Sequence, residues 1–263
     1  MTHPIRLAGT GIRQWLVALC LLLGMGLALA QSPTVAAASS LKVALEEVAF
    51  QFEKETGVKP RLIFGSSGNF YSQIRQGAPF HLFMSADEDF VFRLADDGRT
   101  LDRGRLYAYG RIGLMVPRGS PLKVDGQLRD LAAAIRDGRL RRFAIANPEH
   151  APYGARAREA LEHASLWNAI APSLVMGENI AQTAQFAVSG STQGGIIAES
   201  LALTPAMQAL GEFALIPAEW HRPLGQRMVL LKGAPDSARV FHDYLSSPAA
   251  QTIMKRYGFE MPR

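Results

Sequence analysis

The chain has 263 residues, with 28 Lys and Arg against 23 Asp and Glu, so its formal net charge is +5 at pH 7. Arg6 and Arg13 lie in the first 30 residues, and without them the excess of five positive charges falls to three. So small an excess supports neither nucleic-acid binding nor a polybasic membrane patch. The single cysteine, Cys20, lies in the same segment, so residues 31–263 predict no disulfide and no reactive thiol.

The first 30 residues have the pattern of a bacterial secretory signal peptide. A basic tip precedes the apolar run WLVALCLLLGMGLALA, which ends in the A-x-A pattern of Ala28 and Ala30. We expect cleavage after Ala30 and a periplasmic product. The run could instead stay as a membrane anchor, since its length approaches the lower limit for a span, but an anchor needs no A-x-A site. Lipidation at Cys20 is disfavoured because lipoprotein signals resemble a pattern that has a small residue directly before the cysteine. Here that residue is Leu19.

Beyond this segment, short apolar runs alternate with amphipathic segments, which is typical of an α/β protein. The apolar stretch 34–38 predicts a strand, and the helical spacing that follows predicts a helix over 40–56. Ser39 or Ser40 is the expected N-cap of this helix, and Gly57 is its expected stop.

The same alternation continues to the C-terminus. It predicts strands at 61–64, 81–86, 111–117, 142–148, 171–177, 194–200 and 213–217. It predicts helices at 69–76, from Asp87 to near Gly98, at 130–138, 154–166 and 178–191, and two helices within 236–259 broken at Pro248. Two sets of similar size suggest two lobes, and ligand sites in such folds favour the cleft and the C-terminal ends of strands.

Four predicted helix starts have the chemistry of an anion site. A helix N-terminus presents unpaired N–H groups and about half a positive charge, so it binds an anion without a cationic side chain. Serine hydroxyls add further donors. The four junctions are Ser39-Ser40, Ser66-Ser67, the PEHAPYGAR turn around Tyr153 and the GENIAQ start around Ile180.

Each junction taken alone also has a structural interpretation. A serine before a helix is most often only an N-cap, Tyr153 alone is a packing aromatic, and Ile180 alone is a core residue. Other site types have less support. The six histidines show no HExxH or paired ligand spacing, neither GSSGN nor GSTQG fits the G-x-S-x-G nucleophile elbow, and no G-K-[ST] or G-x-G-x-x-G phosphate loop occurs.

The segments AASSLKVALEEVAFQFEKETGV, FGSSGNFYSQIRQGAPFHLFMSAD, ANPEHAPYGARAREAL and YLSSPAAQTIMKRYGF carry a family resemblance. From about residue 34 onward the chain resembles the molybdate-binding proteins of bacterial ABC importers, which belong to the periplasmic substrate-binding class. The resemblance implies a type II two-lobed α/β fold, with each lobe a sheet flanked by helices and the ligand in the cleft between lobes. The implied lobes are residues 31–111 with 222–263, and residues 112–221.

The resemblance also implies a ligand and its contacts. Molybdate, and with it tungstate, is expected as a whole oxyanion, with no cofactor and no side chain bound directly to the metal. A receptor of this class is not an enzyme; it is expected to be monomeric and to deliver its ligand to an inner-membrane permease and its ATPase. The oxyanion-binding positions carried over are Ser39, Ser40, Ser67, Tyr153 and Ile180.

One position departs from the family pattern. Some members carry a Tyr whose hydroxyl reaches the oxyanion, but here the segment GGIIAESLA places Ala198 there. We hypothesise that the hydroxyl of Tyr153 compensates. Three alternatives stay open from the sequence, namely a receptor for sulfate or another small oxyanion, an exported hydrolase, and an interaction module without a small ligand.

Overall fold

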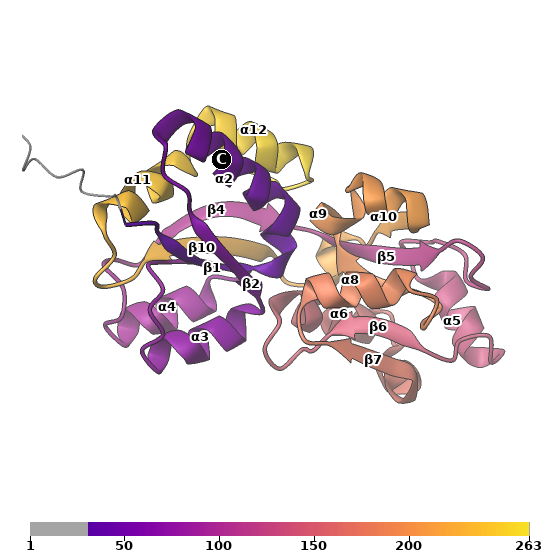
Figure 1. The fold of residues 1–263 in the computed structure, drawn as a ribbon. Coiled ribbons are helices and arrows are strands. Elements are labelled where there is room, and N and C mark those ends of the chain that lie inside the picture. The colour runs from indigo at the N-terminus through magenta and orange to yellow at the C-terminus, as the bar shows by residue number, and fades with distance from the viewer. Residues whose placement is uncertain (1–30, 263) are drawn as a thin grey trace, which may run out of the picture. The chain divides into compact units, whose positions relative to one another are not determined.

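The computed structural model describes residues 31–262, which form two five-stranded sheets with helices packed against them (Figure 1). The predicted signal peptide, residues 1–30, lies outside this described part of the chain. Within residues 31–262, no helix combines the length and the hydropathy needed to cross a bilayer. Two sheets of similar size, each with its own helices, are the architecture that the sequence pattern predicts.

The first sheet contains, in spatial order, β2 (Arg61–Gly65), β1 (Thr34–Ala38), β3 (Leu82–Ser85), β10 (Leu224–Leu230) and β4 (Arg105–Gly110). Strand β1 runs parallel to both β2 and β3, whereas β10 runs antiparallel to both β3 and β4. The three parallel strands therefore end at the same edge of the sheet.

Five helices cover this sheet, namely α2 (Lys42–Thr56), α3 (Ser67–Arg75), α4 (Asp89–Asp96), α11 (Asp236–Tyr244) and α12 (Pro248–Arg256). In Figure 1, α2, α11 and α12 lie on one face of the sheet, and α3 and α4 lie on the other. The strand side chains divide accordingly, because successive side chains point to opposite faces. Val35 and Ala37 belong to the core shared with α2, whereas Ala36 packs in a second cluster with α3 and α4.

The second sheet contains, in spatial order, β7 (Leu174–Gly177), β6 (Phe143–Ala146), β8 (Gly195–Ala198), β5 (Ile112–Pro117) and β9 (Gly211–Leu215). Strand β6 is parallel to β7 and β8, and β5 is antiparallel to β8 and β9. The helices of this part are α5 (Arg129–Arg136), α6 (Pro152–His163), α7 (Trp167–Ile170), α8 (Ile180–Val188), α9 (Glu199–Ala202) and α10 (Pro205–Leu210).

The chain passes between the two sheets twice. Strand β4 ends at Gly110 and β5 begins at Ile112, so the first crossing is a single residue. The return lies between β9, which ends at Leu215, and β10, which begins at Leu224. The strands of the second sheet therefore form one continuous stretch, while those of the first sheet come from both ends. The exact lobe boundaries, 31–111 with 222–263 and 112–221, remain a prediction.

The first predicted helix forms, but its N-cap prediction is wrong. The chain leaves β1 through a 3-10 turn, η1 (Ser39–Leu41), and α2 then runs to Thr56. Gly57 ends it in the left-handed conformation at φ 74°, as expected. In the described part of the chain no side chain caps η1 or α2, and the Ser39 hydroxyl accepts a hydrogen bond from the backbone N–H of Ala181 instead. A tertiary contact has replaced the local one.

Several elements differ from the pattern-based expectation. Strand β4 and the short helices α7, α9 and α10 were not predicted. The stretch 171–177, expected as one strand, begins with the 3-10 turn η2 (Ala171–Ser173) before β7. Another turn, η3 (Ala218–Trp220), lies on the return crossing. At the C-terminus the break at Pro248 is confirmed, because Pro248 is the first residue of α12.

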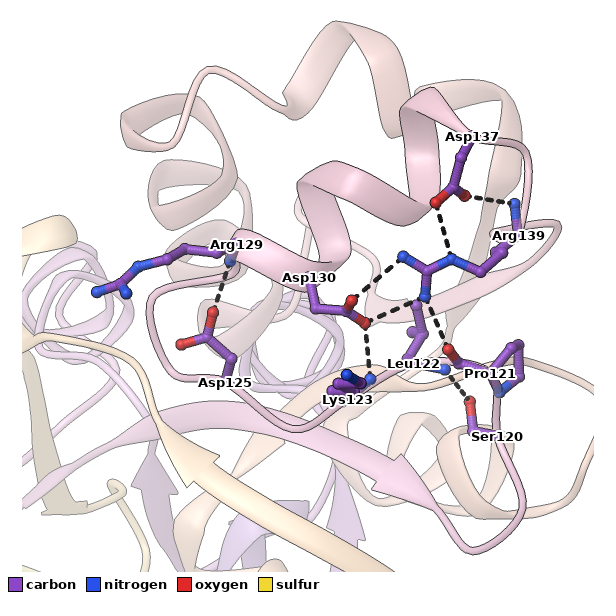
Figure 2. A network of polar contacts seen from close by, with 9 residues as sticks. All are labelled: Ser120, Pro121, Leu122, Lys123, Asp125, Arg129, Asp130, Asp137 and Arg139. Atoms are coloured by element: carbon purple, nitrogen blue, oxygen red, sulfur yellow. Dashed lines mark hydrogen bonds and ion pairs between the residues drawn. The ribbon is translucent and has the colours of Figure 1, made fainter.

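A surface network of charged residues holds the loop before α5 (Figure 2). Arg139 binds the carboxylates of Asp130 and Asp137 at 3.2 Å and 2.8 Å, and it donates to the carbonyl of Pro121 at 2.8 Å. Asp130 also accepts the backbone N–H of Lys123 at 2.7 Å. We call the contacts among these five residues the Arg139 network. It ties the loop 121–123 to both ends of one helix.

Candidate anion-binding site

A small cavity is lined by residues from both halves of the molecule. These are Ala38, Ser39, Gly65, Ser66, Ser67, Ala86, Ala151, Pro152, Tyr153 and Ile180. Four of the five predicted site residues, Ser39, Ser67, Tyr153 and Ile180, are therefore together around one space. The fifth, Ser40, is not among the lining residues.

The topology explains why distant segments meet here. The lining residues lie at or beyond the C-terminal ends of β1, β2 and β3 in the first sheet and of β6 and β7 in the second. Each of these two groups of strands is parallel. Because the carboxyl ends of parallel strands share one edge, each sheet gathers its following turns at a single place, where ligands of α/β folds bind.

The cavity wall is buried and uncharged. Ser39 and Ile180 are 3% exposed, Tyr153 is 2% exposed and Ser67 is 1% exposed. Among the described residues that line the cavity, none is acidic or basic. No group of three or more His, Cys, Asp or Glu side chains that could hold a metal ion occurs within residues 31–262. The wall therefore offers hydroxyl and backbone groups as its polar contacts.

In the wall, the hydroxyls of Ser39 and Ser67 already accept hydrogen bonds from backbone groups distant in sequence. Ser39 Oγ accepts the backbone N–H of Ala181 at 3.2 Å, and Ser67 Oγ accepts the backbone N–H of Ala86 at 2.9 Å. A hydroxyl carries one proton to donate besides its acceptor capacity. With an N–H already directed at each oxygen, Ser39 and Ser67 are set to donate that proton to an acceptor in the cavity.

The helix starts in the second half contribute backbone donors. Tyr153 is the second residue of α6, and Ile180 is the first residue of α8. The first N–H groups of a helix have no acceptor within the helix, and they carry its positive partial charge. The side chain of Asn179 caps Ala181 and Gln182 at 3.0 Å and 3.1 Å, so the N–H of Ile180 is not one of the groups that it satisfies.

Ser40 lies next to the wall, and its hydroxyl differs from those of Ser39 and Ser67 in its contacts. Ser40 is 1% exposed. Its Oγ has no hydrogen-bond partner among the described residues. The Tyr153 hydroxyl is close enough to interact with it, although the contact lacks the geometry of a formed hydrogen bond. Burial raises the pKa of Tyr153 to about 12, so this hydroxyl keeps its proton at neutral pH.

The hydroxyl of Tyr153 also has another partner, because Gln226 Nε2 donates to it at 2.8 Å. Its direct contact with an oxyanion therefore stays a prediction. Ala198, where some family members have a tyrosine, is fully buried at the end of β8 and does not line the cavity.

Contacts at the rim of the cavity join the two halves. The N–H of Gly68 donates to the carbonyl of His150 at 2.9 Å, and the ring Nδ1 of His150 lies 3.0 Å from Ser66 Oγ. Glu178 accepts a hydrogen bond from Asn69 and lies 3.7 Å from the Nε2 of His150. We call these the rim contacts. They bring the start of α3 against the turns before α6 and α8.

Sequence reasoning named Ser66 at a junction but missed His150, Asn69 and Glu178 in the rim contacts. His150 was expected to be structural or facing solvent, and Asn69 and Glu178 were given no role. The available signal was position, since each lies within three residues of a predicted junction residue. Gly68 is required by the same closeness, because a Cβ there would lie 2.7 Å from the His150 carbonyl oxygen.

A family model described as bacterial extracellular solute-binding protein matches residues 33–260. The chain belongs to this family. The resemblance to the substrate-binding class of ABC importers is thus confirmed. Solute-binding proteins are transport receptors, so the chain belongs to this functional class.

Two curated relatives of this solute-binding protein are molybdate-binding proteins. The molybdate-binding protein ModA of Azotobacter vinelandii is 34% identical over 244 residues, covering 90% of this chain and 94% of the relative. The protein of the same name from Rhodobacter capsulatus is 33% identical over 251 residues, covering 94% and 96%.

A solved structure extends the likeness to the fold. The periplasmic molybdate-binding protein of Azotobacter vinelandii superimposes with a TM-score of 0.81 at 30% sequence identity, and the match covers 88% of this chain and all of that one. The predicted two-lobed α/β fold is therefore confirmed.

Proposed function

We propose that this solute-binding protein is a receptor for molybdate, which it binds as an intact dianion in the cavity lined by Ser39, Ser67, Tyr153 and Ile180. The observation that carries the proposal is the convergence of four uncharged donor junctions on one buried space. The names of the relatives at 34% and 33% identity support molybdate as the ligand. Tungstate is a second expected ligand, because the two ions are nearly equal in size and charge.

Neutral donors are sufficient in energy. A hydrogen bond to a charged group contributes roughly 1.5 to 3 kcal/mol, so five such bonds give a gross gain on the order of 10 kcal/mol. Micromolar to nanomolar binding needs about 8 to 12 kcal/mol net of association costs. Donors held in place before the ligand arrives reduce those costs, and here the acceptor contacts of Ser39 and Ser67 supply such fixation.

The direction of the serine hydrogen bonds supports selection against protonated anions. Ser39 and Ser67 each accept an N–H and offer a proton to the cavity. A fully deprotonated oxyanion needs only donors, whereas hydrogen phosphate also needs an acceptor for its own proton. Sulfate passes this test, so a sulfate receptor on the same fold is the nearest rival. Cavity size would then decide between sulfate and molybdate.

The rim contacts contain one arrangement that favours a second candidate, an exported hydrolase. Ser66, His150 and Glu178 lie in line, as the members of a catalytic triad do. However, Ser66 Oγ already accepts the N–H of Asn69 as the N-cap of α3, and the Glu178 side chain is 59% exposed and also bound to Asn69. The arrangement therefore fits a closure contact better than an activated nucleophile, and we propose a receptor without catalytic activity.

The remaining parts of the proposal follow from the class of receptor. The N-terminal pattern supports export to the periplasm with cleavage after Ala30. We propose that the mature chain is a monomer that presents both lobes to one inner-membrane permease and its ATPase. A pure interaction module would not need a buried cavity that two separate halves build together.

Titration calorimetry on residues 31–263 with molybdate, tungstate, sulfate and phosphate tests the proposal. We expect one-to-one binding of molybdate and tungstate, with sulfate far weaker and phosphate weakest. Binding of sulfate alone would keep the site but change the substrate. Silence from all four anions would reject the anion site, and turnover of generic esters that is lost in a Ser66→Ala variant would favour the hydrolase.

A further inference from the structure

A chain of hydrogen-bonded polar side chains leads from the first sheet to the cavity. Tyr107 on β4 donates its hydroxyl to Oε1 of Gln226 on β10 at 2.8 Å. Gln226 Nε2 in turn donates to the hydroxyl of Tyr153 on α6 at 2.8 Å. Gln226 is 0% exposed, and Tyr153 lines the cavity. The interior of one sheet is thus hydrogen-bonded to the binding helix of the other.

The close approach of these groups depends on Gly110. A Cβ at this position would lie 2.3 Å from the Tyr153 hydroxyl oxygen and 2.5 Å from Gln226 Nε2. Gly110 is the last residue of β4, directly before the first crossing between the sheets. The polar chain therefore passes through a gap that only glycine leaves open.

The hydrogen bonds in this chain have a direction. Tyr107 has one hydroxyl proton and two acceptors in reach, Gln226 Oε1 at 2.8 Å and the carbonyl of Ser85 at 3.2 Å, and the shorter contact takes the proton. This holds the amide oxygen of Gln226 toward Tyr107 and its NH2 toward Tyr153. Because the Tyr153 oxygen accepts that N–H, its own proton is free for a different acceptor.

Ser40 is the candidate acceptor for this proton. Its Oγ is buried and has no hydrogen-bond partner within residues 31–262, and the Tyr153 hydroxyl is its polar neighbour. Once Ser40 accepts from Tyr153, its own hydroxyl proton is left for a further acceptor. The cavity is close, because the preceding residue, Ser39, lines it. Ser40 then has the same polarity as Ser39 and Ser67, whose oxygens already accept N–H groups.

We propose that Gln226 is a specificity-determining positioning residue, which acts through Tyr153 to fix Ser40 as a hydrogen-bond donor toward the bound oxyanion. The inference rests on the proposed anion site and extends it to a residue that does not line the cavity. Its consequence is a preference for anions that carry no proton, since an anion with an O–H group finds no acceptor at Ser40.

A double-mutant cycle tests whether Gln226 acts through Ser40. Gln226→Met keeps a similar side-chain length and removes both amide contacts. We expect it to weaken molybdate binding about tenfold, the lower range for one hydrogen bond to a charged group. In a Ser40→Ala background, the same substitution should change the molybdate affinity by less than roughly twofold, because the group through which it acts is gone.

Anion selectivity gives a second measurement, whose value a purely structural role of Gln226 would leave unchanged. At about pH 8, sulfate and hydrogen phosphate carry the same charge and are similar in size, but only phosphate has an O–H group. The ratio of sulfate to phosphate affinity, measured by displacement of molybdate, should fall several-fold in Gln226→Met. It should stay unchanged when Gln226→Met is added to Ser40→Ala.

Tyr107→Phe provides a milder second variant, since it removes only the donor that orients the amide. Melting curves of all variants show whether they are folded. If Gln226→Met does not fold, the same cycle with Tyr107→Phe tests whether the chain acts through Ser40. Additive losses in the Ser40→Ala background, with molybdate bound normally by the unmodified protein, would overturn this inference alone. An unmodified protein that binds none of the anions would overturn the proposed function and the inference with it.

Discussion

The cavity and the Arg139 network differ in the groups that they present to a negative charge. In the Arg139 network, two carboxylates meet a guanidinium at the surface, where Arg139 is 33% exposed and Asp137 is 49% exposed. The cavity is proposed to hold a dianion deep inside, yet its described lining contains hydroxyl and backbone groups and no cation. On this proposal, the protein uses arginine for structure at the surface and neutral dipoles for binding in the interior.

The difference follows from the cost of burying charge. A buried cation without its ligand would be desolvated and unpaired in the open receptor, which is expensive. Neutral donors leave no such charge behind when the anion departs. Even the buried Arg156 conforms to this division, because it pairs with Glu159 on the same helix and does not line the cavity.

Placing a negative charge in the wall should break the site most severely. Ser67→Asp puts a carboxylate where a hydroxyl donates, and we expect it to lower molybdate affinity by on the order of a thousandfold or more. Ser67→Ala, which only removes the donor, should cost about ten- to a hundredfold. Titration calorimetry measures both effects. Ser72→Ala on the same helix is the matched control, and an equal loss there would point to a disturbed helix.

Interference with closure should come next in size. In Gly68→Ala the new Cβ would meet the His150 carbonyl oxygen at 2.7 Å, so the rim contacts must separate. We expect molybdate affinity to fall about tenfold, with little change in the melting temperature of the ligand-free protein. Small-angle scattering should show a more open average shape in the presence of ligand. Normal affinity with an unchanged scattering profile would show that the rim contacts are not required for binding.

A partly buried carboxyl beside the cavity should give a pH-dependent stability. Burial raises the pKa of Asp87, the neighbour of the lining residue Ala86, to about 6. Because this pKa is above that of the unfolded chain, the folded state holds the proton more tightly. Stability is then lost as the pH rises from about 4 through about 6.

Asp87→Asn keeps an acceptor for the N–H of Phe90 and removes the ionisable group. We expect it to stabilise the protein above pH 6 by on the order of 2 kcal/mol and to flatten that pH dependence. Denaturant unfolding between about pH 4 and pH 8 checks this. A variant that tracks the parent curve in parallel would show that Asp87 ionises freely in the folded state.

The smallest effect is expected from the Arg139 network itself. Arg139→Ala should leave molybdate affinity within roughly twofold and lower the melting temperature only slightly, as is usual for surface ion pairs. Hydrogen bonds from Arg139 lower the pKa values of Asp130 and Asp137. The difference between parent and variant should therefore be present at neutral pH and vanish as acid protonates both carboxyls.

Arg129→Ala is the matched control for that variant, because Arg129 contributes its backbone N–H to Asp125 while its side chain points away from the network in Figure 2. A loss of molybdate binding in Arg139→Ala, absent in Arg129→Ala, would contradict the separation of structural and binding charge.

Local sequence patterns predicted most of the helices and strands because the backbone preferences of neighbouring residues decide where such elements begin and end. The left-handed Gly57 and the break at Pro248 follow from what glycine and proline permit in the backbone. The edge where the junctions meet could also be predicted, since parallel strands gather their C-terminal ends. Strand β4 was missed because its partner, β10, lies more than a hundred residues away in sequence, and no local signal records that pairing.

The site was predicted less completely than the fold. The Ser39 hydroxyl was expected to cap its own helix, but it bonds to Ala181 across the molecule, which no local rule anticipates. Ser40 was placed in the site both by its junction and by resemblance, yet it lies beside the wall and not in it. The roles of Gln226 and Tyr107 depend on contacts between distant strands, and only the three-dimensional arrangement reveals them.

The position of β10 in the first sheet also has a consequence for the order of folding. This strand lies between β3 and β4, although it is made after every strand of the second sheet. Contacts between distant segments form late because a long loop must close first. We therefore expect the second sheet, built from one continuous stretch, to form before the first. A growing chain would complete its first sheet only after its last strand arrives.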